Sequence, residues 1–269
     1  MPMFRTLLAV LVLSSITLLA GAMPTSVFVV HCEPTRANAM MWLGLVDLVA
    51  QADTYNVPLS IDFTPQWASM ILEDADKLDA LQNWIAAGHE IGCHHHGYWG
   101  TKERGSTWDG YTNTPVGELD PGDQTRFLGT MDDYMTLLNT LPGERLSGCM
   151  GGSHSGDDID YPCQLRYATV GYALDDVVTT PLEIERNGCD VIEIGHGLIA
   201  SQDRGALRAL YETTDDEAIF GVNGHVYNFA AFPQAFIEWF RFLHTLDPEG
   251  SARRTVSSAI EEWEQAQAE

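Results

Sequence analysis

The chain has 269 residues, of which 45% are hydrophobic and 19% charged, and its formal net charge is −24. This length and apolar content suit one domain with a sizeable core and exclude extensive disorder. The strong negative charge argues against nucleic acid as a partner. Only Lys77 and Lys102 among the 14 basic residues are lysines. Such a surface suits a salty medium or a cationic glycan, although plain solubility is the simpler explanation.

The first 22 residues have the pattern of a secretory signal peptide. Arg5 precedes an apolar run over residues 7–19, and Ala20, Gly21 and Ala22 form a small-x-small cleavage signature. A retained membrane anchor is the alternative, but the run is short for a span of about 20 residues. We therefore expect a single domain over residues 23–269 that is secreted or periplasmic, with no stable membrane insertion after cleavage.

Apolar runs typical of buried strands alternate with segments of helical spacing along the mature chain. Strands are predicted at residues 26–31, 58–64, 89–96, 145–151, 168–172, 191–195 and 218–224. Helices are predicted at residues 37–52, 75–87 (ending at Gly88 in a C-cap position), 123–141 (capped by Asp123), 201–216, 233–245 and 253–267. A long loop over residues 97–122 is typical of a functional segment.

This alternation predicts a parallel sheet with helices outside it. Seven strands favour an α/β fold of the distorted (β/α)7-type barrel kind, in which the chemistry lies at the carboxyl ends of the strands. Most of the nine histidines fall at those predicted ends, which is the strongest functional signal in the sequence. They are His31, His94, His95, His96, His154, His196 and His225.

Imidazole and carboxylate groups gathered at one edge of a barrel favour a site for a divalent metal, with Zn²⁺ first and Co²⁺ or Ni²⁺ as alternatives. Glu33 offers oxygen at the end of the first strand. In an extended segment His94 and His96 point to the same side, so this pair fits better than one that includes His95. The alternative is that the three histidines are partly a surface polar tract.

Other catalytic motifs are weaker. His89-Glu90 begins like a zinc-protease HExxH motif, but the next histidine is His94 and the segment has strand character. No GxSxG, Walker or GxGxxG motif is present. The acid pairs at 157–158 and 175–176 are typical of solvated loops rather than of a glycosidase.

The five cysteines suit an oxidising compartment if the signal peptide is genuine. Cys163 and Cys189 flank one predicted strand-and-loop region and are expected to form a disulfide. Cys32, Cys93 and Cys149 each end a predicted strand, where they are either packed core thiols or pocket-lining thiols.

The segment Gly88–His94 (GHEIGCH) closely resembles the GHEIGxH strand of the polysaccharide deacetylase family, also called the NodB homology domain or carbohydrate esterase family 4. The order of elements is similar across nearly the whole mature chain. The resemblance implies a NodB-like deacetylase fold and metal-dependent removal of acetyl groups from a carbohydrate or small acylated substrate.

The resemblance also implies roles for particular residues. The family's strand-one Asp-Asp provides a general base and a metal ligand, whereas Cys32-Glu33 stands here, so Glu33 takes the metal role and His31 is the substitute base. His94 matches the first histidine of the family's His-x-x-x-His motif. Position 98 is Tyr98, so the second ligand shifts to His96.

Further departures mark a divergent member. No arginine matches the family's Arg-Pro motif at the strand that carries Cys149 and Met150. The closing catalytic histidine looks like His225, with His196 as the competitor. Candidate substrate-binding residues, which could instead form a small satellite core under the long loop, are Tyr98, Trp99, Trp108 and Tyr111; His154 is a further candidate.

The sequence therefore predicts a secreted metal-dependent hydrolase that removes acyl groups from a glycan or amino sugar. One alternative is a catalytically inactive glycan-binding protein on the same fold. Another is a metal-dependent hydrolase of a small amide or other C–N bond.

Overall fold

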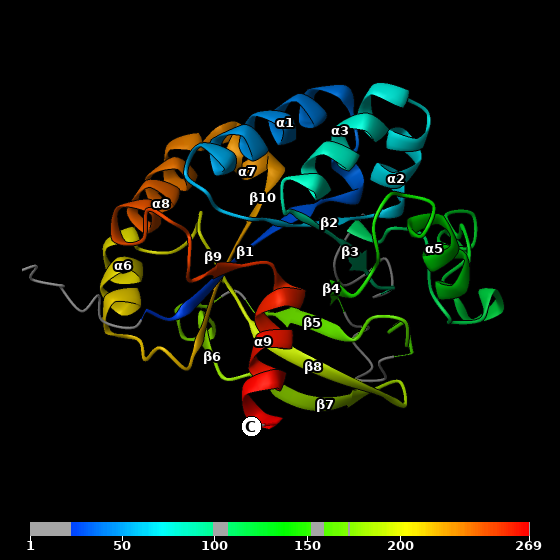
Figure 1. Cartoon of the computed structure of the whole chain (residues 1–269). Helices are drawn as coiled ribbons and strands as arrows, with labels where there is room; N and C mark the ends of the chain where they lie inside the picture. The colour runs from blue at the N-terminus through cyan, green and yellow to red at the C-terminus, as the bar shows by residue number, and fades with distance from the viewer. Residues whose placement is uncertain (1–22, 99–106, 152–158, 172, 269) are drawn as a thin grey trace, which may run out of the picture.

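The computed structural model describes residues 23–98, 107–151, 159–171 and 173–268 (Figure 1). The predicted signal peptide at 1–22, Trp99 and His154 lie outside these residues. The helices are α1 (Ala39–Thr54), α2 (Pro65–Leu72), α3 (Ala75–Ala86), α5 (Met131–Leu138), α6 (Arg204–Thr213), α7 (Val226–Ala231), α8 (Pro233–Leu246) and α9 (Val256–Ala268).

The strands of the described residues join in one curled, mixed sheet. They are β1 (Thr25–Cys32), β2 (Ser60–Phe63), β3 (Glu90–His96), β4 (Ser147–Gly151), β5 (Tyr167–Val170), β6 (Val178–Thr179), β7 (Leu182–Arg186), β8 (Cys189–Gly195), β9 (Gly197–Leu198), β10 (Ile219–His225) and β11 (Arg253–Arg254).

The seven predicted strands are all present, and they form the parallel part of the sheet in the order β10-β1-β2-β3-β4-β5-β8. The antiparallel strands β6 and β7 were not predicted. The short strand β9 follows β8 after one residue and pairs with β10, which brings the two ends of the parallel array together. The predicted distorted α/β barrel is therefore confirmed.

The two faces of the sheet are covered differently (Figure 1). Helices α1, α2, α3, α7 and α8 pack on the outer face and form the main core, whereas α9 packs against the inner face. Along β1, Val27 and Val29 face inward to α9, while Phe28 and Val30 face outward to the helices. Because side chains alternate along a strand, residue 31 continues the inward row.

The predicted helix at 123–141 is wrong in its first half. Helix α5 begins at Met131, where Thr130 and Asp133 form a capping box. Asp123 is instead buried in the preceding loop and pairs with Arg126 at 3.0 Å. The Thr130 side chain satisfies a free backbone N–H group in the first turn of α5. The residues after Asp123 form turns rather than a helix, so Asp123 has no helix to cap.

The remaining long predicted helices are confirmed with small shifts at their ends. Gly88 follows the C-cap of α3 with φ of +100°, as the predicted stop signal requires. The short helices α2 and α7 were not predicted, because 6 to 8 residues carry too little periodic signal.

Cys163 and Cys189 form the predicted disulfide, with their Cα atoms 5.4 Å apart. The other three cysteines are free and buried, and Cys32 and Cys93 belong to the main core. In the part of the chain that the structure describes, no helix is long and apolar enough to cross a membrane.

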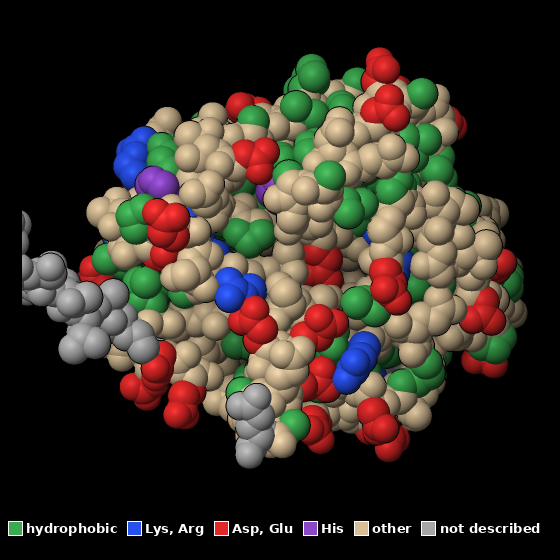
Figure 2. All heavy atoms as spheres, in the orientation of Figure 1, with side chains coloured by type: hydrophobic (Ala, Val, Ile, Leu, Met, Phe, Trp, Pro, Cys, Tyr) green, Lys and Arg blue, Asp and Glu red, His purple; other side chains and the backbone are tan. Residues whose placement is uncertain are grey.

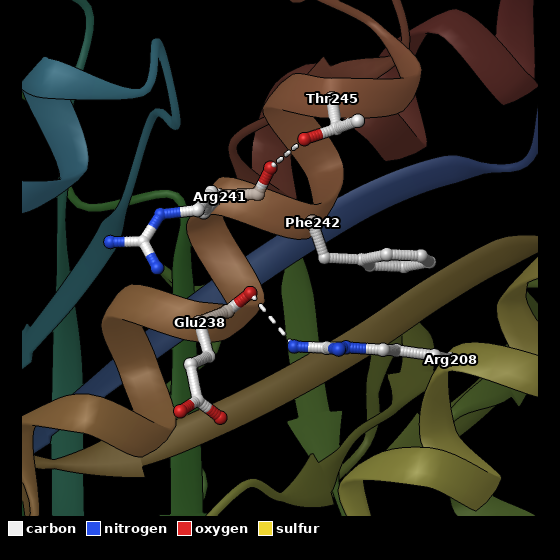
Figure 3. Close-up of a pocket in the computed structure, with 5 residues that line it drawn as sticks. All are labelled: Arg208, Glu238, Arg241, Phe242 and Thr245. Carbon is white, nitrogen blue, oxygen red and sulfur yellow. Dashed lines mark hydrogen bonds between the residues drawn. The ribbon is translucent and has the colours of Figure 1, made fainter.

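On the outer side, α6 is joined to α8 through Arg208 (Figure 3). The Arg208 guanidinium lies 5.3 Å from the centre of the Phe242 ring and donates a hydrogen bond to the carbonyl of Glu238 at 3.2 Å. Acidic side chains are spread over the face shown in Figure 2, and basic ones are few, as the composition predicts.

Candidate metal centre

A pocket opens at the carboxyl ends of the barrel strands, and its wall includes Glu33, His94, His96 and His225. These residues come from the end of β1, from β3 and from the end of β10. His94 and His96 reach the pocket together because they are two residues apart on one strand. The predicted gathering of histidines at this end of the fold is thus observed for these residues.

The Glu33 carboxylate lies at the centre of the group. Its Oε1 is 3.5 Å from His94 Nε2 and 3.1 Å from His225 Nε2. Its Oε2 is 3.1 Å from His96 Nε2, and the Nε2 atoms of His94 and His96 are 3.0 Å apart. One ligand atom each from Glu33, His94 and His96 lies within 4.8 Å of the other two.

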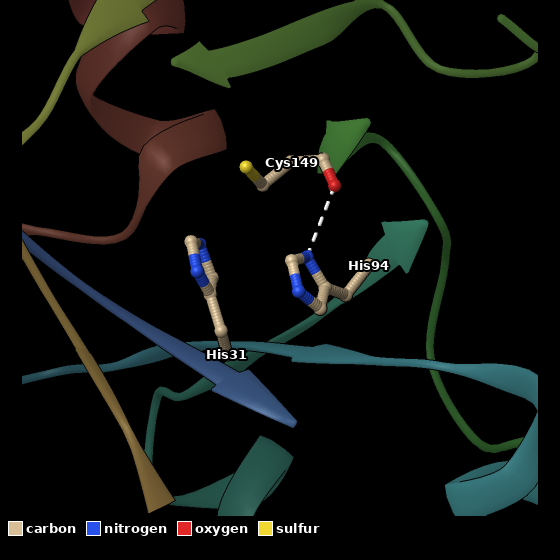
Figure 4. A group of neighbouring side chains, drawn as sticks. All are labelled: His31, His94 and Cys149. Atoms are coloured by element: carbon tan, nitrogen blue, oxygen red, sulfur yellow. Dashed lines mark hydrogen bonds between the residues drawn. The ribbon is translucent and has the colours of Figure 1, made fainter. Parts of the chain in front are cut away.

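Hydrogen bonds decide which nitrogen of two of these rings is available. His94 Nδ1 lies 3.1 Å from the carbonyl oxygen of Cys149 (Figure 4). A carbonyl can only accept, so Nδ1 carries a hydrogen, and Nε2 is the nitrogen that faces Glu33 and could bind a metal ion. This is how a metal-binding histidine is usually held, with its second nitrogen donating to a backbone carbonyl. The donor set of one carboxylate and imidazole nitrogens fits Zn²⁺ or a similar divalent ion.

The protonation states also suit ligands. Burial alone would raise the pKa of Glu33, but its hydrogen bonds with His225, His94 and His96 hold that pKa well below the usual range. Burial lowers the pKa of His94 to about 4, and the neighbouring histidines add to the effect. Near neutral pH, Glu33 is therefore a carboxylate and His94 a neutral imidazole, the forms that bind a metal.

His31 and His196 are buried deeper in the fold than Glu33, His94 and His96. Both side chains are fully buried, and neither is among the described residues that line the pocket. The His31 ring stacks on His94 with centroids 4.4 Å apart, and burial lowers the pKa of both His31 and His196, the latter to about 4. The predicted base His31 thus stacks on the ring of His94 and is not among the described residues that line the pocket.

His94 also belongs to a second group of possible ligands. In this group, His31, His94 and Cys149 have ligand atoms within 4.8 Å of one another (Figure 4). However, the Nδ1 hydrogen of His94 is already donated to the Cys149 carbonyl, and its other nitrogen faces Glu33. The group that contains Glu33 is therefore the better metal site.

The structure places His95 outside the metal group, which corrects its inclusion among the candidate ligands. Its Nδ1 lies 2.8 Å from Asp109 Oδ2, and its Nε2 lies 3.8 Å from Asp160 Oδ2. His95 alternates with His94 and His96 along β3 and so turns away from Glu33. Asp109 also accepts the backbone N–H of His96 at 3.2 Å, so this pair holds the end of β3 in place.

Three of the aromatic residues proposed for sugar stacking, Tyr98, Trp108 and Tyr111, are packed against other side chains. Trp108 and Tyr111 are only 7% and 8% exposed, and the Trp108 indole donates to the Tyr111 carbonyl at 2.8 Å. Tyr98 packs on Trp108 with ring centres 5.1 Å apart, and its hydroxyl accepts from the N–H of Asp120 at 2.8 Å. Trp108 and Tyr111 are therefore buried, and Tyr111 belongs to the main core, whereas Tyr98 is partly buried.

Sequence reasoning missed several residues that line the pocket. Tyr227 stands two residues after His225, and Met150 and Thr169 lie at the ends of β4 and β5. Their positions after predicted strands were a usable signal. Arg186 also lines the pocket, but it belongs to the unpredicted strand β7, so nothing in the sequence pointed to it.

No protein-family model matches the sequence, and no curated protein matches it. Solved structures do match the fold. A candidate polysaccharide deacetylase from Mycobacterium smegmatis aligns with a TM-score of 0.53 at 12% identity, over 91% of this chain and 92% of that one. A 4-alpha-glucanotransferase from Thermococcus litoralis aligns with a TM-score of 0.51 at 11% identity, over 88% of this chain but only 38% of that one.

A family 4 acetyl xylan esterase from Clostridium thermocellum, solved with a cobalt ion, aligns at 13% identity over 88% of this chain and 90% of that chain. Its TM-score of 0.48 is too low to carry an inference. Since a deacetylase and a glucanotransferase match almost equally well, the fold alone does not select the reaction. The chain has the NodB-like fold of the polysaccharide deacetylases, as the GHEIGCH segment predicts, and is a divergent example of it.

Proposed function

We propose that the protein is a secreted, metal-dependent hydrolase that removes acyl groups, chiefly acetyl, from a glycan or amino sugar. The observation that carries the proposal is the convergence of Glu33, His94 and His96 in the pocket, with ligand atoms within 4.8 Å of one another. The fold shared with a candidate polysaccharide deacetylase supports the substrate class. Secretion rests on the pattern of residues 1–22.

Glu33, His94 and His96 would hold the ion, with Zn²⁺ first and Co²⁺ or Ni²⁺ as alternatives. When bound, such an ion polarises an acyl carbonyl and lowers the pKa of water. The Cys149 carbonyl orients His94 for this task, and the stacked ring of His31 supports it from below. His225 lines the pocket beside Glu33, where it can move a proton.

Binding of a glycan without turnover is the second candidate, and one observation favours it. In the family the strand-one base is an aspartate, but here Cys32 faces the outer core and His31 lies below the pocket. Neither can take a proton from a water in the pocket. If no other residue does so, the protein binds and does not hydrolyse.

The first test is the metal content of the purified protein by mass spectrometry, beside a His94→Ala/His96→Ala variant. We expect about one ion per wild-type chain and none in the double variant, with folding checked by circular dichroism. His244→Ala is the matched control, because His244 lies on α8 and is not among the residues of the pocket, so this variant should keep its metal.

The second test is acetate release after reconstitution with Zn²⁺, Co²⁺ or Ni²⁺. Wild type and His244→Ala should release acetate from acetylated chitooligosaccharides or acetylated xylan, and the double variant should not. Saturable glycan binding without acetate release would favour the binding protein, and release only from small acetylated amides would favour the small-amide hydrolase. Absence of metal from wild type after reconstitution would overturn the hydrolase.

A further inference from the structure

The pocket also reaches the hairpin formed by β7 and β8. Its volume is about 700 Å³, which lies within the ~300–1,000 Å³ of typical small-molecule sites, so it has room for part of a ligand beside the metal group. On the hairpin side its wall includes Arg186, the last residue of β7. Arg186 is the only lysine or arginine among the described residues that line the pocket. Its guanidinium does not belong to the metal group, so its role is open.

Glu193 holds the Arg186 side chain in place. Arg186 Nη2 donates a hydrogen bond to Glu193 Oε2 on the neighbouring strand β8, and the two side chains are only 18% and 15% exposed. The guanidinium also lies 5.9 Å from the centre of the Tyr161 ring. Because both charged side chains are largely removed from solvent, the pair is a fixed part of the pocket wall rather than a mobile surface contact.

The tip of the hairpin is fastened to the chain near Cys163. The turn between β7 and β8 is the two-residue loop Asn187-Gly188, with φ of +50° and +73°, and it sets Arg186 opposite Cys189. Cys189 is joined to Cys163 by the disulfide. The side chain of the first turn residue donates to the carbonyl of Tyr161 at 3.0 Å. The backbone of Arg186 is therefore held by a covalent link and a hydrogen bond close beside it.

The charges around Arg186 favour an uncharged ligand over an anionic one. Glu193 already balances the guanidinium, so the pair adds no net charge to the pocket. The whole chain has a formal net charge of −24, which repels anionic polymers. A guanidinium carries several N–H donors and can donate to Glu193 and to a ligand at once. Hydroxyl and carbonyl oxygens of an uncharged sugar are suitable acceptors.

We propose that Arg186 is a substrate-binding residue that donates hydrogen bonds to oxygen atoms of an uncharged sugar, and that the Cys163–Cys189 disulfide positions it. This rests on the proposed function, because it takes the substrate to be a glycan that occupies the same pocket as the metal group. The substrate is thereby narrowed to neutral acylated glycans, and affinity for them depends on an intact disulfide.

Calorimetric titration of the metal-free protein with an N-acetylated chitooligosaccharide measures binding without turnover. Arg186→Gln alone leaves Glu193 unpaired, so the decisive variant is Arg186→Gln/Glu193→Gln, which removes both charges. We expect it to bind about 10–100-fold more weakly than wild type, the usual effect of losing hydrogen bonds from a charged donor, and Arg186→Lys to keep part of the affinity. Arg254→Gln/Glu262→Gln is the matched control, because this ion pair is not among the described residues of the pocket.

The positioning role is tested with two variants that loosen the hairpin tip in different ways. Cys163→Ser/Cys189→Ser removes the disulfide, and Asn187→Gly tolerates the positive φ but removes the bond to the Tyr161 carbonyl. Both should weaken binding by no more than the loss of Arg186 does. Adding Arg186→Gln to the serine variant should cost less than in wild type, since the contact is already impaired. Circular dichroism checks folding.

Kinetics after reconstitution with Zn²⁺ give a second readout. Each of these variants should raise KM with little change in kcat or in metal content, because the cited contacts of Arg186 do not include the metal group. A fall in kcat together with loss of metal would overturn the inference, since the hairpin would then act on the metal group instead of on the substrate.

An acidic oligosaccharide tests the class of sugar. Wild type should bind the N-acetylated chitooligosaccharide with little dependence on NaCl, and it should not bind an acetylated oligogalacturonate more tightly. Tighter binding of the acidic oligosaccharide that falls steeply with NaCl would overturn the assignment to an uncharged sugar.

The remaining outcomes separate this inference from the proposed function. Wild-type affinity in Arg186→Gln/Glu193→Gln, or no binding of the neutral oligosaccharide by wild type, would overturn the substrate-binding role even if acetate is released. Wild-type affinity in both Cys163→Ser/Cys189→Ser and Asn187→Gly would overturn the positioning role. Binding that depends on Arg186 without metal or acetate release would overturn the hydrolase and leave the role of Arg186 intact.

Discussion

His95 is a buried histidine placed between two carboxylates. Burial alone would lower its pKa, but Asp109 and Asp160 raise the pKa to about 9 from an ordinary value of 6.5. The folded chain therefore keeps a proton that the unfolded chain loses between these two values. Since the folded state binds more protons in this window, the stabilisation is complete below pH 6.5 and is lost as the pH rises through 9.

We expect His95→Gln to be most destabilising at acid pH. The difference in unfolding free energy between wild type and variant should shrink by up to about 3 kcal/mol as the pH rises from about 6 to about 10. Urea unfolding at several pH values measures this. A pH-independent difference for His95→Gln would show that His95 is not charged in the fold.

At the same scale, alternation along a strand separates residues that are adjacent in sequence. On β3 it directs His94 and His96 to Glu33 and His95 to Asp109. On β1 it sends Cys32 into the outer core and leaves His31 on the inner face. The first separation could be predicted from the sequence. The position of His31 relative to the pocket could not be predicted from the sequence, because it depends on how far from the pocket the inward-facing side chains of β1 lie.

At the scale of elements, the barrel depends on a close approach of β8 and β10. Gly195 ends β8, and a Cβ added to Gly221 on β10 would overlap the carbonyl oxygen of Gly195. Backbone atoms cannot move aside as a flexible side chain can. Gly221 therefore allows the ends of the parallel array to meet, and β9 then pairs with β10 two residues after β8 ends.

Gly221→Ala should therefore be destabilising by about 1–3 kcal/mol, the usual range for overpacking, and more if the strands cannot separate. Gly117→Ala is the matched control, because no atom lies within 4 Å of its added Cβ, and it should change stability by less than about 0.5 kcal/mol. Thermal and urea unfolding of both variants provide the measurement. Equal stability of Gly221→Ala and wild type would mean that the two strands are not in close contact.

For the whole molecule, the dominant physical property is its charge. With a formal net charge of −24, the negative side chains repel one another across a compact surface. Salt screens this repulsion, with a Debye length of about 10 Å at 0.1 M. We expect the melting temperature to rise between low and molar NaCl. Potassium chloride should act equally, since the effect is general, and chloride avoids the separate stabilising effect of sulfate. A flat or falling melting temperature would contradict this prediction.

The sequence by itself determined the seven parallel strands, the long helices, the disulfide and the cluster of histidines at one end of the fold. These follow from hydrophobic periodicity and from what comes after each strand, which are local properties of the chain. The approach of Glu33, His94 and His96 also followed, because strand alternation and the shared edge of a parallel sheet place them together.

Only the tertiary structure decided how each histidine is used. The carbonyl that orients His94 belongs to Cys149 on β4, and the carboxylate that pairs with His95 belongs to Asp109 in the loop that packs on β3. The burial of Trp108 and Tyr111 likewise depends on how the long loop folds back. Such contacts depend on packing between distant segments, which no local pattern encodes.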